Sequence, residues 1–296
     1  MAMQQNDTYV ELRRSIQQEK ERRIREHQAQ VAARRRLRMA MADTSPEGLN
    51  LLAQGDSWFD YPLPTPFTPS DVVAHLKHLP GKTPLVCSLA HHGEAAEDML
   101  GVRKLHELID QLKNPQANGR YDAILFSGGG NDIAGDQFRL WLNEAAAVHN
   151  DPAQGLNTER VAAIMEVIKA GYEDLMAARD AIDKTISIFG HSYDFPIPNN
   201  VGLPCAGPWL YPGFEDRGWT DVNLNRGIIK RLLQQHAAML DVFAAEAKRN
   251  FVHVRTQGTL TDTQWDNELH PTPDGFAAIT VKFVQALRQH FGANRI

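Results

Sequence analysis

Short apolar runs alternate with longer amphipathic segments along most of this chain, and this alternation restricts the possible fold more than any other feature. Five short apolar runs, most of them with β-branched residues, are typical of buried parallel strands: residues 49–53, 85–89, 123–126, 186–189 and 251–254. Apolar residues recur at helical spacing over residues 97–112, 161–175 and 224–243, and a last helical segment runs from Pro273 to about Phe291. We therefore predict an α/β fold: a doubly wound, flavodoxin-like, five-stranded parallel sheet in three α/β/α layers.

Residues suited to catalysis follow four of the five predicted strands. Ser57 comes after the first strand, Gly93 after the second, Asn131 after the third and His270 after the fifth. Ligands of doubly wound sheets bind beyond the carboxyl ends of the strands, so we expect these four residues to meet there. A serine in such a place can act as a nucleophile, a histidine can accept its proton, and amide groups can stabilise an oxyanion.

In this order, the segments that contain these residues resemble the sequence blocks of the SGNH (GDSL-type) hydrolases. The matching blocks are Gly55-Asp56-Ser57, Gly93, Gly129-Gly130-Asn131-Asp132 and Asn267-Glu268-Leu269-His270-Pro271. Each block alone is short, and the first is also a good turn sequence, but their ordered combination over about residues 48–291 is specific. The resemblance implies a serine hydrolase of the esterase or lipase type that needs no cofactor.

The same resemblance implies a role for each block. Ser57 would be the nucleophile and His270 its general base, while the amides of Ser57 and Gly93 and the side chain of Asn131 would form the oxyanion hole. The substrate would be a small-molecule or carbohydrate ester. Esterases, thioesterases and carbohydrate deacetylases share this machinery, and an acyltransferase is the nearest enzymatic alternative. A catalytically idle member of the fold that serves as a binding module is the alternative from another class.

The third member of the catalytic triad departs from the family pattern. The family has an acid three residues before the histidine, where this chain has Asn267, flanked by Asp266 and Glu268. An amide can orient the imidazole of His270, but it does not stabilise the imidazolium with a full charge. Three solutions stay open: Asp266 serves after a small loop shift, Glu268 reaches the ring from the other side, or Asn267 holds the ring in a weaker Ser-His arrangement.

A segment rich in aromatic residues and prolines, residues 193–220, follows the fourth strand. We expect a loop inserted over the pocket, with Tyr193 and Trp209 lining the substrate site, although the same rings could only hold the loop together. The sequence Gly190-His191-Ser192-Tyr193-Asp194 resembles the start of a nucleophile elbow. An elbow requires glycine at the fifth position and a following helix, which the prolines disfavour, so we prefer the loop.

Two adjacent histidines raise the alternative of a metal site. His91 and His92, with Glu94 and Asp98, supply the ligand types that zinc prefers. Adjacent residues of an extended segment point to opposite faces, however, so both imidazoles rarely reach one ion. We therefore expect no metal.

The first 40 residues differ in charge from the rest of the chain. They contain ten Lys and Arg against five Asp and Glu, a net charge of +5, which leaves −10 for residues 41–296. We predict a basic helical arm over residues 1–45, followed by the hydrolase domain over residues 46–296. The arm is either a solvated helix or, through residues 10–38, a contact for an anionic surface. Tyr9 is its only aromatic residue, which argues against nucleic acid, and we expect deletion of residues 1–40 to leave turnover unchanged.

The expected location is cytoplasmic. No run of about eighteen apolar residues is present, and the first residues lack the apolar region of a signal peptide. The two cysteines, Cys87 and Cys205, are expected to be free thiols, which fits a reducing compartment.

Overall fold

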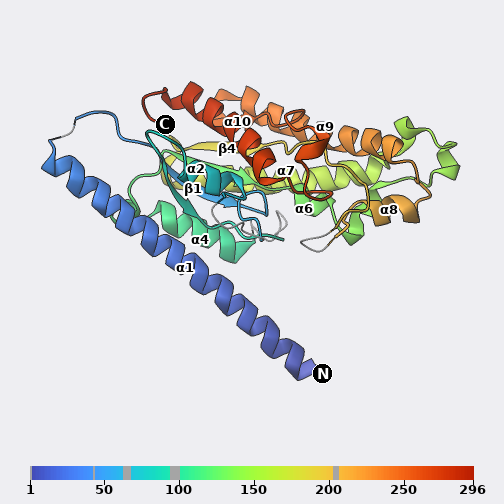
Figure 1. Ribbon diagram of the computed structural model, residues 1–296, viewed down its shortest axis with the longest axis horizontal. Helices are drawn as coiled ribbons and strands as arrows, with labels where there is room; N and C mark the ends of the chain where they lie inside the picture. Colours follow the sequence, from blue (N-terminus) through green and yellow to red (C-terminus); the bar gives the residue numbers. More distant parts are fainter. Residues whose placement is uncertain (1, 43, 63–67, 94–100, 203–206) are drawn as a thin grey trace.

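A five-stranded parallel sheet forms the centre of the computed structural model, which describes residues 2–42, 44–62, 68–93, 101–202 and 207–296 (Figure 1). The strands are β1 (Asn50–Gly55), β2 (Leu85–Ser88), β3 (Ala123–Ser127), β4 (Ser187–His191) and β5 (Phe251–Val254). They correspond to the five predicted apolar runs and lie in the order β2-β1-β3-β4-β5. This is the flavodoxin-like order, so the predicted fold class is confirmed.

Helices cover both faces of the sheet. The α-helices of the described residues are α1 (Ala2–Ala40), α2 (Val72–Lys77), α4 (Val102–Leu112), α5 (Pro115–Asn118), α6 (Gly130–Ile133), α7 (Thr158–Asp183), α8 (Tyr211–Asp216), α9 (Val222–Ala245) and α10 (Pro273–Phe291). Short 3₁₀-helices lie at Asp136–Trp141, Ala146–Val148, Pro152–Gln154, Ala247–Arg249 and Asp262–Gln264. The predicted amphipathic segments correspond to α4, α7, α9 and α10, except that residues 97–100 lie outside the described residues. None of the described helices is long and apolar enough to cross a membrane.

Two apolar cores fill the space between the sheet and its helices. On one face, Leu52, Ile124 and Ile188 belong to a core that also contains residues of α4, α7 and α9. On the other face, Leu51 and Leu125 belong to a core completed by residues of α2 and α10. Successive strand residues point to opposite faces, and here both faces are buried.

The parallel register brings the strand ends together at one end of the sheet. Gly55 of β1 is paired with Ser127 of β3, and Phe126 of β3 is paired with Gly190 of β4. The long segment after β5 ends at α10. The start of this helix is fixed, because Thr272 Oγ1 accepts a hydrogen bond from the Gly275 amide at 3.2 Å and a proline follows the cap. The segments that follow the strands therefore converge.

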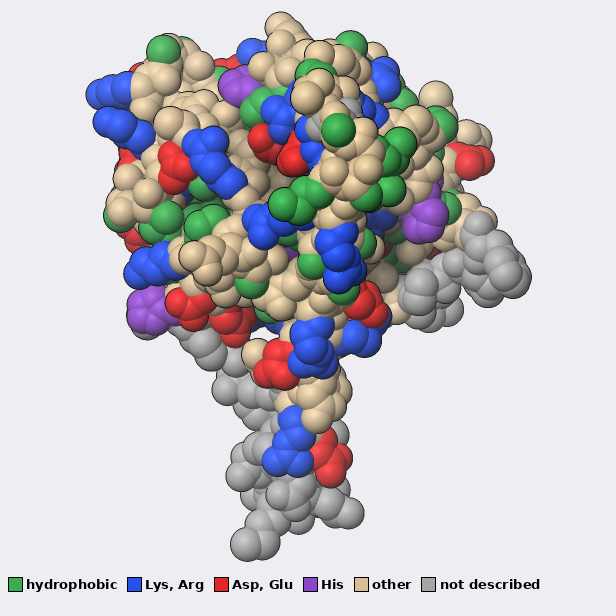
Figure 2. Space-filling model, turned by 90° about the vertical axis from the view of Figure 1, so that its left-hand side faces the viewer, with side chains coloured by type: hydrophobic (Ala, Val, Ile, Leu, Met, Phe, Trp, Pro, Cys, Tyr) green, Lys and Arg blue, Asp and Glu red, His purple; other side chains and the backbone are tan. Residues whose placement is uncertain are grey.

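The predicted basic arm is one helix, α1, and its C-terminal half packs against the body beside β2 while its first turns project away (Figure 1). His27 Nε2 lies 2.7 Å from Asn50 Oδ1, and the His27 ring stacks on Tyr121. Val31 is buried, and Arg34 donates to the carbonyl oxygen of Gly48 at 2.7 Å. Where α1 leaves the body, acidic and basic side chains are mixed (Figure 2). The arm is thus joined to the body over much of its length.

This packing predicts that deletion of residues 1–40 also affects the stability of the body. We now expect the deletion to lower Tm by roughly 10 °C, because the body loses the cover of Val31 and Ile24, both packed on it. Burial of an apolar side chain contributes about 1.5–3 kcal/mol, and about 2–4 °C are lost per kcal/mol in a chain of this size. Thermal unfolding of the deletion variant measures the change.

A matched pair of substitutions in α1 separates packing from charge. Val31→Asp is expected to lower Tm by several degrees, while Leu37→Asp, at a side chain that is 61% exposed on the same helix, should leave it unchanged. Equal effects of the two substitutions would contradict the docking of α1.

Candidate active site

The turn after β1 presents Ser57 at the end of the sheet. Gly55 passes so close to β3 that a Cβ there would lie 2.8 Å from Ser127 Cβ, so this position requires glycine. The amides of Phe59 and Asp60 donate to the carbonyl oxygen of Asp56, which closes the turn around Ser57. The serine side chain is buried but borders a pocket.

Ser57 and His270 lie within hydrogen-bond distance. Ser57 Oγ is 2.8 Å from His270 Nε2, and His270 Nδ1 is 2.9 Å from Asn267 Oδ1. The Asn267 oxygen also accepts the amides of Leu269 at 3.1 Å and His270 at 3.0 Å. An amide oxygen only accepts, so His270 Nδ1 carries the hydrogen and Nε2 can accept the serine proton.

The two carboxylates that flank Asn267 have other partners. Asp266 Oδ2 accepts a hydrogen bond from the Tyr61 hydroxyl at 2.6 Å, and the Tyr61 ring packs on His270 with 5.1 Å between the ring centroids. Glu268 is fully buried and accepts four backbone amides, those of residues 200, 209, 210 and 211. Of the three candidates for the third position, the structure places Asn267 alone at the His270 ring and turns Glu268 toward the inserted loop.

Burial lowers the pKa of His270 to about 4, and the nearby imidazole of His92 adds to this effect. His270 is therefore neutral at neutral pH, which is the form that accepts a proton. The neutral Asn267 offers no opposite charge to raise the pKa again. The histidine is well oriented, but as a base it is weaker than one paired with a carboxylate.

The two predicted oxyanion donors beyond Ser57 differ in their positions. Asn131, on the short helix α6, lines the same pocket as Ser57. Gly129, with φ +103°, makes the sharp turn into this helix, a conformation that favours glycine. Gly93 is exposed at the end of a described range and is not among the residues that line the pocket. Asn131 thus shares a pocket with Ser57, and Gly93 stays a predicted donor.

A buried polar network that the sequence analysis missed lies beneath the serine. Asp56 Oδ1 accepts the Ser127 hydroxyl at 2.7 Å, and Asp56 Oδ2 accepts the Tyr193 hydroxyl at 2.5 Å. His191 Nδ1 accepts the amide of Tyr193, so His191 Nε2 carries the hydrogen and donates to Ser127 Oγ at 2.8 Å. Burial raises the pKa of Asp56 to about 6, against the hydrogen bonds from Tyr193 and Ser127. The sequence contained an indication of this network, since polar residues stand directly after the first and fourth predicted strands.

The pocket beside Ser57 is a small cavity of about 50 Å³. Its walls are mainly apolar and include Ile133, Leu210, Leu233 and Trp265. Tyr193 is among the residues that line it, and its hydroxyl is engaged with Asp56. Trp209 instead packs edge-on against His270, with 5.3 Å between the ring centroids. Residues 203–206 of this loop, including Cys205, lie outside the described residues.

A larger groove of about 550 Å³ lies on another side of the site, lined by residues of α1 and α2 and of the turn after Ser57. Tyr61 and His92 belong to its wall. The Tyr61 ring also packs on the predicted general base, His270, so a single side chain connects the groove wall to the site.

The structure describes one of the two alternative sites in full and the other only in part. Ser192 of the elbow-like sequence is buried, and its hydroxyl has no hydrogen-bond partner among the described residues. Within the described ranges, no three metal-ligating side chains gather at one point. Glu94 and Asp98 of the possible metal site lie outside those ranges.

The predicted blocks at the ends of β1, β3 and β5 meet at one site, as their order in the sequence led us to expect. The chain resembles the SGNH (GDSL-type) hydrolases. No protein-family model and no curated protein matches it. Similar solved structures include a catalytic mutant of an acetylxylan esterase from Geobacillus stearothermophilus, with 14% identity, 82% of this chain and 95% of that chain covered, and a TM-score of 0.48.

Two further structures of comparable similarity are a lipase from a goat rumen metagenome and a GDSL-like lipase from Parabacteroides merdae. The first has 17% identity, a TM-score of 0.48 and coverage of 80% of this chain and 97% of that chain. The second has 14% identity, a TM-score of 0.43 and coverage of 82% and 97%. Identities and TM-scores this low transfer no activity to the chain.

We expect Asn267→Asp to raise kcat/KM. We also expect it to shift the acid limb of the pH profile, which is the pH range in which kcat/KM falls as the pH is lowered. The neutral imidazole is the active base, so kcat/KM of the wild type should fall as the pH drops through about 4. A carboxylate at Nδ1 favours the imidazolium and should move this limb upward by about 1–3 pH units. The pH profile of ester hydrolysis measures the shift.

Asp266→Asn is the matched control, because this neighbouring carboxylate pairs with Tyr61 and not with the ring nitrogens. Its acid limb should stay where the wild type has it. A limb that does not move in Asn267→Asp would contradict the assigned orientation of His270.

Asn131→Ala should lower kcat by roughly 10²–10³-fold with little change in KM, because an oxyanion donor acts chiefly in the transition state. Steady-state kinetics on a short-chain aryl ester tests this. Asn223→Ala, at an exposed asparagine of α9, serves as the control and should behave as wild type. A change confined to KM would make Asn131 a substrate contact and not an oxyanion donor.

Proposed function

We propose that the protein is a serine hydrolase that cleaves a carboxylic ester through an acyl-enzyme on Ser57. The observation that carries the proposal is the continuous hydrogen-bond chain from Ser57 through His270 to Asn267. A structural serine at a turn would not require a buried histidine whose Nε2 faces its hydroxyl as a proton acceptor. The pocket that opens at this serine gives an acyl group access to it.

The first half-reaction forms the acyl-enzyme. Ser57 Oγ bonds to the acyl carbon while its proton moves to His270 Nε2. The amide of Ser57 and the side chain of Asn131 donate to the oxyanion, with the Gly93 amide remaining a predicted donor. When the ester C–O bond breaks, the leaving oxygen takes the proton from His270.

The second half-reaction returns the enzyme to its starting state. His270 accepts a proton from water, whose oxygen attacks the acyl carbon, and the proton then returns to Ser57 Oγ as the carboxylic acid leaves. Throughout both steps Asn267 holds the Nδ1–H tautomer. It supplies orientation without charge, so we expect turnover below that of a full Ser-His-Asp triad.

The volumes of the small cavity and of the larger groove favour an ester of a short acyl group and a larger alcohol. A cavity of about 50 Å³ has room for only a few water molecules, at about 10–15 Å³ each, and so suits a short acyl chain. His270 gives its proton to the leaving oxygen, so the leaving group lies beside this ring. The larger groove bordered by Tyr61 offers that space.

One observation favours a second candidate, a catalytically idle binding module. The neutral Asn267 stands where a charge would normally support the histidine. A fluorophosphonate probe distinguishes the two candidates, because only an activated serine reacts with it at an appreciable rate.

Ser57→Ala should lower hydrolysis of 4-nitrophenyl acetate by about 10⁴-fold or more with the fold intact, since loss of the nucleophile removes the acyl-enzyme route. Ser192→Ala is the matched control, because the hydroxyl of this buried serine makes no hydrogen bond to the described residues, and it should retain activity. The proposal would fail if purified Ser57→Ala hydrolysed the ester within tenfold of wild type.

A further inference from the structure

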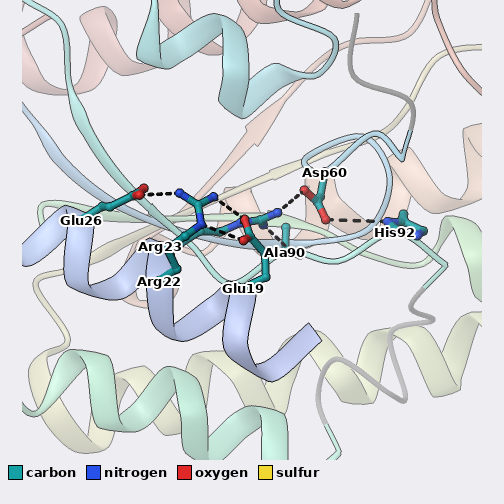
Figure 3. Close-up of polar contacts among 7 residues, drawn as sticks. All are labelled: Glu19, Arg22, Arg23, Glu26, Asp60, Ala90 and His92. Carbon is teal, nitrogen blue, oxygen red and sulfur yellow. Dashed lines mark hydrogen bonds and ion pairs between the residues drawn. The ribbon is translucent and has the colours of Figure 1, made fainter. Parts of the chain in front are cut away.

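One arginine of α1 reaches the edge of the active site. Arg23 Nη2 donates to Asp60 Oδ1 at 2.8 Å, and Arg23 Nη1 donates to the carbonyl oxygen of Ala90 at 3.1 Å (Figure 3). Arg23 Nε is held from within the helix by Glu19 at 2.9 Å. The guanidinium therefore joins α1 to two separate segments of the body.

Both segments belong to the surroundings of Ser57. Asp60 is the last residue of the turn that contains the serine, and its amide donates to the carbonyl oxygen of Asp56 at 3.1 Å. Ala90 follows β2, and the amide of the next residue, His91, donates to the carbonyl oxygen of Gly55 at 3.0 Å. Arg23 thus connects the turn after β1 to the end of β2, on either side of the point where the nucleophile begins.

The contacts are shielded from solvent. The side chains of Arg23 and Asp60 are 19% and 18% exposed. Burial alone would raise the pKa of Asp60, but the neighbouring His92 and the Arg23 guanidinium lower it below its usual value, so the carboxylate is charged. A partly buried ion pair with hydrogen bonds holds its geometry better than an exposed pair does.

Neighbouring arginines of α1 do not make such contacts. Arg22 pairs with Glu19 and Glu26, and Arg25 lies 3.7 Å from Glu21, so both interact within the helix. The Arg25 side chain is 67% exposed. Of these three arginines, Arg23 is the one that contacts the segments around Ser57.

We propose that Arg23 is a positioning residue of the active site. The helix α1 then contributes to catalysis, and its deletion would lower turnover, contrary to the expectation from the sequence. The inference rests on the proposed function of Ser57. By holding Asp60 and Ala90 together, Arg23 fixes the turn from which the serine hydroxyl and its amide act. Small displacements of such groups lower the rate of the chemical step more than they lower substrate binding.

The test compares Arg23→Ala with Arg25→Ala in the full chain, with 4-nitrophenyl acetate as substrate and active sites counted by fluorophosphonate labelling. We expect kcat per active site to fall by about tenfold in Arg23→Ala, with KM within twofold of wild type. Arg25→Ala should match the wild type in both. A loss of stability alone would lower the number of active sites and not the turnover of each.

Arg23→Lys provides the conservative variant. A lysine retains a cation for Asp60 but is a point charge that does not span Asp60 and the Ala90 carbonyl as the planar guanidinium does. We expect kcat about threefold below wild type, between the alanine variant and the native enzyme. This variant retains a positive charge beside the Asp60 carboxylate. It therefore tests the positioning role of Arg23 even if Arg23→Ala does not fold.

A double-mutant cycle tests whether Arg23 acts through Asp60. Adding Arg23→Ala to Asp60→Asn should lower kcat by less than threefold, because the shared interaction is already broken. The inference is overturned if Arg23→Ala or Arg23→Lys retains wild-type kcat, if only KM changes, or if Arg25→Ala has the same effect. A wild-type protein that hydrolyses no ester would overturn the proposed function itself, and with it this inference.

Discussion

The buried carboxylate of Asp56 connects the ends of three strands, and the geometry of the site depends on it. It follows β1, accepts the Ser127 hydroxyl at the end of β3, and accepts the hydroxyl of Tyr193 just beyond β4. Hydrogen bonds to a charged group contribute about 1.5–3 kcal/mol each. Because Ser57 is the next residue in the chain, this network fixes the backbone from which the serine acts.

The residue at the third position of the triad orients the histidine but does not supply a negative charge. Asn267 receives three hydrogen bonds on one oxygen and holds the His270 ring, but it brings no negative charge. The two flanking carboxylates make structural hydrogen bonds instead. Asp266 accepts the hydroxyl of Tyr61, whose ring packs on His270, and Glu268 accepts backbone amides of the inserted loop. The result is a neutral histidine of low pKa in an ordered setting.

The strands and the meeting of Ser57, Asn131 and His270 could be predicted, because hydrophobic period and parallel topology determine which residues follow strand ends. The direction of a side chain within a loop could not, since it depends on contacts from distant segments. Glu268 illustrates this, as its partners lie about 60 residues away in the chain. Arg23 illustrates it too: in a run of mixed charges it is indistinguishable from solvated neighbours, and only the docking of α1 reveals its partners.

The most direct test of the account is to map the residue that a fluorophosphonate modifies in the wild-type protein at neutral pH. Intact mass and peptide mass spectrometry would give the number and the position of the adducts. The account predicts a single adduct, on Ser57, because His270 Nε2 lies 2.8 Å from its hydroxyl oxygen. An adduct on another serine, or an unmodified folded protein after prolonged exposure, would contradict it.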